Sequence, residues 1–134
     1  KYTNEQPAEN WTVKQFDDSN WKTGEAGFGP KGYFQSATEW NAHPDIWIRN
    51  SFEVDSPSEE GLALVINYND DAEIYINGNL VGSYSGACSN LKVIKLNKKV
   101  NELLIPGKNT IAIHCKWTGG NRYIDAGLKE YKIK

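Results

Sequence analysis

The dipeptide Asn77-Gly78 constrains the fold of this chain more than any other local feature. It lies between two runs with strand character, Ala72 to Ile76 and Asn79 to Tyr84. Both residues of an Asn-Gly pair tolerate positive φ, which a type I′ turn requires at its two central positions. The pattern therefore predicts an antiparallel β-hairpin with Asn77-Gly78 as its turn.

Further short strands are predicted on both sides of this hairpin. Successive residues of Trp47 to Val54 are expected to point to opposite faces of a strand. The face expected to lie against the core holds Ile46, Ile48, Phe52 and Val54. Leu62 to Ile66 is apolar on both parities, which is typical of a strand buried on both faces. The remaining predicted elements are strands over Lys92 to Leu96, Thr110 to Trp117 and Gly127 to Ile133, and one helical turn over Val100 to Ile105. Many short strands without sustained helical periodicity indicate an all-β, antiparallel β-sandwich of the jelly-roll type.

The first 45 residues follow a different pattern, because they are rich in Gly, Asn, Asp and aromatic residues and show weak periodicity. We expect this segment to wrap across the sandwich and to form loops at one end. Nothing in the sequence divides the chain, so residues 1–134 are predicted to form a single domain. The sequence contains no Met, and we expect the domain to be excised from a larger multidomain protein.

Composition excludes several classes of function. Hydrophobic residues make up 39% and charged residues 24% of the chain, which argues against disorder. The net charge is −2 and no basic stripe is present, so nucleic acid is not an expected partner. The longest apolar runs, Leu62 to Ile66 and Ile111 to Ile113, are too short to span a bilayer, and no membrane insertion is predicted.

Six segments together resemble a known family. They are Phe16-Asp-Asp-Ser-Asn-Trp21, Gly27-Phe-Gly29, Ile46-Trp-Ile-Arg-Asn-Ser-Phe52, Asp70-Asp-Ala-Glu-Ile-Tyr-Ile-Asn-Gly78, Pro106-Gly-Lys-Asn-Thr-Ile-Ala-Ile113 and Tyr123-Ile-Asp-Ala-Gly-Leu128. In this order and spacing they resemble the N-terminal sugar-binding domain of glycoside hydrolase family 2 enzymes. More broadly, they are similar to the galactose-binding-domain-like jelly rolls attached to secreted bacterial glycan-degrading proteins. One departure is Asn50, because many relatives carry a second basic residue after the position of Arg49.

The resemblance implies a non-catalytic accessory domain that binds carbohydrate or positions it for a glycoside hydrolase. Its expected partners are carbohydrate and a catalytic domain of the same parent chain, and its expected location is extracellular or periplasmic. A structural module that packs on a neighbouring domain and binds no sugar is the alternative. Fold alone does not decide between the two.

Sugar binding uses aromatic faces against C–H surfaces and planar polar groups against hydroxyls. Candidate residues lie in the irregular stretch before residue 45 and around the Gly119-Gly120 break. They are Tyr33, Trp40, Trp117, Arg122 and Asp125. The alternative is that these aromatics simply pack on the ends of the sandwich. Trp11, Trp21 and Trp47 are predicted to be core residues.

No catalytic residues are predicted. The adjacent acid pairs, such as Asp17-Asp18 and Asp70-Asp71, cannot face each other across a glycosidic bond, since neighbouring strand residues point to opposite faces. Capping of turns and loops is the expected role of these acids. No cofactor or metal is assigned, although jelly rolls of this type often hold a structural calcium, for which Asp17, Asp18, Asp70, Asp71 and Asp125 are the candidate ligands. The pairing of Cys88 with Cys115 is left open.

Overall fold

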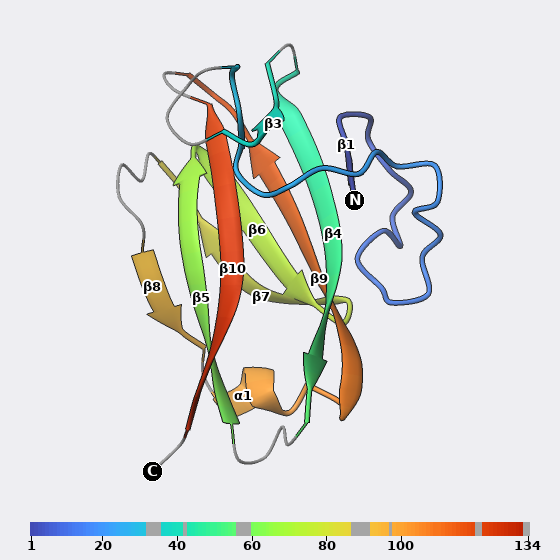
Figure 1. The fold of residues 1–134 in the computed structure, drawn as a ribbon, viewed down its shortest axis with the longest axis vertical. Coiled ribbons are helices and arrows are strands. Elements are labelled where there is room, and N and C mark those ends of the chain that lie inside the picture. The colour runs from blue at the N-terminus through green and yellow to red at the C-terminus, as the bar shows by residue number, and fades with distance from the viewer. Residues whose placement is uncertain are drawn as a thin grey trace.

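The computed structural model describes residues 1–31, 36–41, 43–55, 60–86, 92–96, 98–119 and 122–132. Two five-stranded sheets face each other (Figure 1). Sheet I has the order β1 (Tyr2–Thr3), β4 (Asp45–Val54), β9 (Gly107–Lys116), β6 (Asp71–Ile76) and β7 (Asn79–Tyr84). Sheet II has the order β3 (Thr38–Glu39), β2 (Phe28–Gly29), β10 (Tyr123–Lys132), β5 (Glu60–Asn69) and β8 (Lys92–Lys95). All these pairings are antiparallel except β2 with β3, so the predicted all-β sandwich is confirmed.

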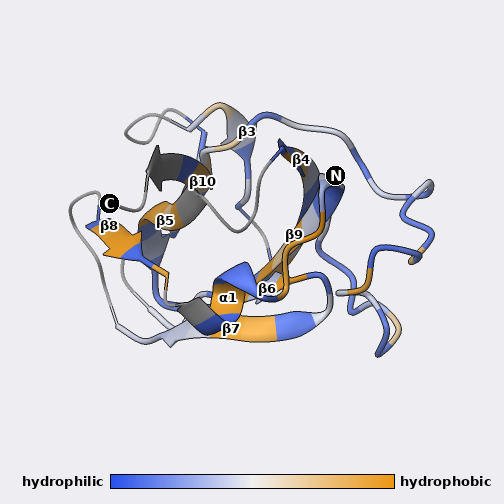
Figure 2. Ribbon diagram, turned by 90° about the horizontal axis from the view of Figure 1, so that it is seen from below, coloured by the Kyte–Doolittle hydropathy of each residue, from blue (hydrophilic) through white to orange (hydrophobic). Residues whose placement is uncertain are grey.

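The core lies between the two sheets. Ile46, Ile74 and Cys115 of sheet I have no exposed surface, and neither do Leu64, Ile66 and Ile124 of sheet II. In β5, Leu62, Ala63 and Leu64 are all buried, so both faces of the strand are covered there, as its apolar sequence predicts. The turn of helix α1 (Lys98–Asn101) lies across one end of the sandwich (Figure 2), where Leu96, Val100 and Leu104 join the core cluster.

The predicted hairpin is present as β6 and β7. Asn77 has φ 48° and Gly78 has φ 86°, the conformation that Asn-Gly was expected to supply. The Asn77 side chain also leaves the hairpin: its Nδ2 donates to Asn109 Oδ1 over 2.8 Å, and its Oδ1 accepts from Thr110 N over 2.9 Å. The turn is therefore tied to the start of β9.

The N-terminal segment wraps the sandwich as predicted. It pairs β1 with β4 and then passes outside sheet I before it reaches β2 (Figures 1 and 2). Because this segment covers the first half of the outer face of β4, that part is buried as well, whereas Ser51 and Glu53 are exposed. Trp47 is 8% exposed and Arg49 is 4% exposed, although both point away from the core between the sheets.

Two of the three tryptophans predicted as core residues lie elsewhere. Trp11 and Trp21 are only half-buried and do not belong to the inter-sheet core. Trp11 packs edge-on against Tyr75, and Trp21 packs against Phe16. Trp47 is buried as predicted, but it stacks on His114 outside sheet I, with ring centroids 4.7 Å apart. In each case the cause is the N-terminal segment, which packs outside sheet I and forms a second layer of side chains there.

Candidate functional site

One end of the sandwich gathers three of the five predicted ligand residues. Trp40 follows β3, Trp117 follows β9 and Arg122 precedes β10, so all three lie at the end where β4 begins (Figure 1). The guanidinium carbon of Arg122 lies 4.1 Å from the ring centroid of Trp117 and 5.6 Å from that of Trp40. Residues distant in the sequence therefore form one aromatic–cation cluster.

The two tryptophans of this cluster have different environments. Trp40 is 1% exposed, belongs to the core cluster and donates from Nε1 to the carbonyl oxygen of His43 over 2.9 Å. No face of its ring is open, so the structure assigns Trp40 to the core rather than to the predicted ligand contact. Trp117 is half-buried and keeps surface open to solvent. The large apolar ring of Trp40 closes the end of the sandwich, where its burial removes apolar surface from water.

Arg122 is buried but incompletely hydrogen-bonded. It is 8% exposed, and its Nε has no hydrogen-bond partner. Desolvation lowers the pKa of the guanidinium, which nevertheless stays charged at neutral pH. A buried N–H donor without a partner is uncommon, because burying a donor that makes no hydrogen bond costs free energy. The Nε atom has no accessible surface, and the guanidinium packs against the half-buried ring of Trp117.

Asp70 fixes the turn that carries Trp117. Its Oδ2 accepts hydrogen bonds from Thr118 N over 2.7 Å, Thr118 Oγ1 over 2.8 Å and Gly119 N over 2.9 Å. Burial opposes ionisation of this carboxyl, but the three hydrogen bonds outweigh it and the pKa of Asp70 is lowered. The expected capping role of this acid is confirmed, and the carboxylate holds the loop next to the cluster in one conformation.

The other predicted ligand residues are not in the cluster. Asp125 lies on β10 opposite Asn67 of β5. It is three positions from Arg122, about 10 Å along an extended strand. Tyr33 lies outside the described residues.

Two of the acids noted in the sequence have structural partners. Asp17 caps a turn by accepting from Ser19 N, whereas Asp18 pairs with Arg49 on the outer side of sheet I. Within the described ranges, no three or more His, Cys, Asp and Glu side chains converge on a point where a metal ion could be held. Cys115 is a buried free thiol whose pKa is raised by desolvation, and Cys88 lies outside the described residues. No helix in the described part of the chain is long and apolar enough to cross a membrane.

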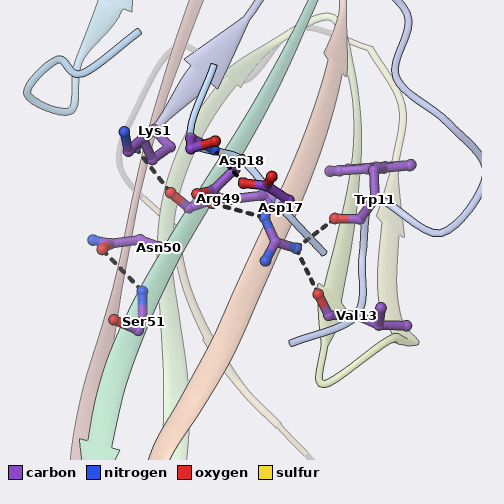
Figure 3. Close-up of polar contacts among 9 residues, drawn as sticks. Lys1, Trp11, Val13, Asp17, Asp18, Arg49, Asn50 and Ser51 are labelled. Atoms are coloured by element: carbon purple, nitrogen blue, oxygen red, sulfur yellow. Dashed lines mark hydrogen bonds and ion pairs between the residues drawn. The ribbon is translucent and has the colours of Figure 1, made fainter. Parts of the chain in front are cut away.

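A second polar site surrounds Arg49 on the outer side of sheet I (Figure 3). Arg49 Nε lies 3.0 Å from Asp18 Oδ2, and Nη1 donates to the carbonyl oxygens of Trp11 and Val13. The guanidinium also lies 5.2 Å from the centroid of the Phe16 ring. Sequence analysis did not select this site, since its members come from the N-terminal segment and from β4, and only the fold brings them together.

Solved structures share this fold, although they have little sequence identity with the chain. No protein-family model matches the sequence, and no curated protein matches it either. Among solved structures, the chain superposes over 93% of its length on a glycosyl hydrolase family 2 member from Bacteroides cellulosilyticus, with a TM-score of 0.68 and 16% identity. It superposes over 96% of its length on a beta-glycosidase from Bacteroides vulgatus, with a TM-score of 0.64 and 17% identity.

The fold is similar to a part of solved glycoside hydrolase family 2 structures. A third match, Bacteroides uniformis beta-glucuronidase 2, has a TM-score of 0.67 and 18% identity over 94% of this chain. In each case the chain spans only a small part of the matched protein: 19% of the first two and 17% of the third. The resemblance read from the six sequence segments is thus confirmed at the level of fold.

Proposed function

We propose that this chain is a non-catalytic accessory domain of an exported glycoside hydrolase, in which it binds carbohydrate or positions it for the catalytic domain. Two kinds of observation support the accessory role. The chain corresponds to less than a fifth of each matched glycosidase, and Asp17, Asp18 and Asp70 act as turn caps or ion-pair partners. Hydrolysis of a glycosidic bond requires two carboxyl groups on opposite sides of that bond.

The observation that carries the carbohydrate role is the contact between Trp117 and Arg122. The half-buried indole ring can pack against the C–H face of a pyranose. Arg122 lies against the indole, with its guanidinium carbon 4.1 Å from the ring centroid. Asp70 holds the adjoining turn, so the ring is presented in a fixed orientation.

The test is a glycan-array screen of the chain and of its Trp117→Ala variant. We expect a reproducible hit for the wild type, at least a tenfold loss in the variant, roughly what 1.4 kcal/mol of binding energy represents, and a small change in the thermal midpoint. Trp40→Ala is the matched control, because loss of a buried aromatic costs about 3–5 kcal/mol of stability.

The alternative function is a structural module that packs on a neighbouring domain. A wild-type chain that binds nothing across a broad array would favour that function. A Trp117→Ala variant that retains glycan binding would remove Trp117 from the site. A large drop in its thermal midpoint would reassign the ring to the core.

A further inference from the structure

A cavity of about 310 Å³ lies between the N-terminal segment and the outer face of sheet I. Its lining consists of Lys1, Lys14, Phe16, Asp18, Arg49, Asn50, Ser51, Lys108 and Thr110. Four of these side chains are basic and one is acidic, although the chain as a whole has a net charge of −2. The cavity therefore concentrates positive charge on an otherwise slightly acidic molecule, which favours an anionic ligand.

The one acid in the lining is already neutralised. Asp18 forms the ion pair with Arg49, which leaves the lysines to set the charge of the cavity. Lys14 and Lys108 are exposed, and neither forms an ion pair with any described residue. They come from the N-terminal segment and from β9, so the fold brings two ammonium groups to one cavity.

Arg49 supplies a further donor at the base of the cavity. Its side chain is 5% exposed, and Nε and Nη1 make all of its hydrogen bonds to described residues. The remaining nitrogen, Nη2, makes no hydrogen bond to the residues drawn in Figure 3. It is also not one of the fully buried nitrogens that lack a hydrogen-bond partner. Nη2 thus keeps accessible surface and presents N–H groups that no described residue accepts.

We propose that this cavity binds the anionic group of an acidic sugar, a uronate carboxylate or a sulfate ester. The anion is held between Arg49 Nη2 and the ammonium groups of Lys14 and Lys108, since charge-assisted hydrogen bonds are the strongest that an oxyanion can accept. The half-buried Phe16 ring offers apolar surface to the sugar, and Asn50, Ser51 and Thr110 line the cavity with groups suited to hydroxyls. The volume is near the lower end of the ~300–1,000 Å³ range of small-ligand sites, which fits one sugar unit.

This inference rests on the proposed carbohydrate-binding function but uses a different site. Trp117 lies at the end of the sandwich where β4 begins, whereas the cavity borders Arg49 to Ser51 within β4 and Lys108 to Thr110 within β9. The two sites can therefore be tested separately.

The experiment is a titration of the chain with methyl glucuronide, glucose 6-sulfate, methyl glucoside and inorganic sulfate, followed by NMR chemical shifts. We expect one or both acidic sugars to bind, with shifts centred on residues 14–18, 49–51 and 108–110, and methyl glucoside to bind at least tenfold more weakly. Lys14→Gln and Lys108→Gln should each weaken acidic-sugar binding by about tenfold, because each removes one charge-assisted hydrogen bond to the anion. Lys129→Gln is the matched control, because Lys129 is exposed on β10 and lies outside the cavity.

Arg49 is not substituted in this test, since its removal would also release the N-terminal segment. Acidic-sugar binding that Lys14→Gln and Lys108→Gln leave unchanged would overturn this site while the proposed function stands. Equal binding of inorganic sulfate and glucose 6-sulfate would reduce the site to one for simple anions and overturn the sugar assignment. Acidic-sugar binding lost in the lysine variants but kept in Trp117→Ala would support this site as one separate from Trp117.

Discussion

At the scale of single residues, Arg49 shows how one buried charge joins two layers. It belongs to β4, yet its contacts are with the N-terminal segment: the carboxylate of Asp18, two backbone carbonyl oxygens and the ring of Phe16. The Trp-x-Arg pattern in β4 is visible in the sequence, but the partners are 31 to 38 positions away. Strand periodicity places Arg49 away from the core and says nothing about what covers it.

Replacing Arg49 with Met should destabilise the chain. The substitution leaves Asp18 and two carbonyl oxygens without their donor, and breaking a buried pair from one side costs about 3–5 kcal/mol. Chemical denaturation followed by tryptophan fluorescence measures the difference. Asp17→Asn serves as the control, because the fully exposed Asp17 caps only its own turn. Equal stabilities of Arg49→Met and the wild type would show that the Arg49 contacts with the N-terminal segment contribute nothing to stability.

Asp70 leads to a prediction about pH. Because its pKa is lowered in the folded chain, ionised Asp70 contributes stability above its unfolded pKa of about 4. That contribution is lost as the pH falls through the lower folded pKa. The difference in thermal midpoint between the wild type and Asp70→Asn should therefore be constant from about pH 5 to pH 8 and shrink below about pH 4. A difference independent of pH down to pH 2 would contradict the role of the carboxylate charge.

At the scale of elements, the strands were largely predictable and the outer layer was not. Asn79 to Tyr84 was predicted with the observed bounds of β7, and the predicted strands ending at Val54 and Ile76 end there in β4 and β6. β5 and β9 begin earlier than predicted, because sheet pairing extends them through residues whose own strand preference is weak. β10 also begins earlier, at Tyr123 instead of Gly127, where it pairs with the end of β5. Tertiary context overrides β-propensity in this way.

The candidate site was partly predictable for a related reason. Aromatic residues beside Gly119-Gly120 and before residue 45 indicated the end of the sandwich where Trp117 and Arg122 meet. Local sequence does not distinguish a ring that closes the core, as Trp40 does, from one that stays half-open. The cavity beside Arg49 carries no local signal, since its lining combines the N-terminal segment with two separate strands.

The turn of the β6–β7 hairpin should contribute stability through its side chain as well as its backbone. Asn77→Gly keeps the positive φ but removes the bonds to Asn109 and Thr110 and the one from Nδ2 to the Leu103 carbonyl oxygen. We expect a loss of about 1–3 kcal/mol, since buried groups lose their partners. Asn79→Ala is the control, because exposed Asn79 makes one side-chain bond, to the Asn77 carbonyl oxygen. Stability equal to that of the wild type would mean that only the backbone conformation of Asn77 matters.

At the scale of the whole molecule, the two sheets share one core, so neither can lose its packing alone. The core cluster draws buried residues from β4, β6 and β9 of sheet I and from β2, β5 and β10 of sheet II. A cavity made on one side of this cluster removes contacts from the other. Substitution in either sheet should therefore destabilise both, and unfolding should be a single cooperative transition.

Leu64→Ala tests this coupling. Leu64 lies in sheet II without exposed surface, and its truncation should cost about 2–5 kcal/mol. Amide hydrogen exchange should then accelerate by the same factor in β9 and β6 of sheet I as in β5 and β10 of sheet II, since all exchange through one global opening. Val93→Ala is the control, because Val93 is 64% exposed and its loss should change stability by less than about 0.5 kcal/mol. Acceleration confined to sheet II would show that the sheets open separately, and the ligand sites at Trp117 and Arg49 would then rest on independently stable layers.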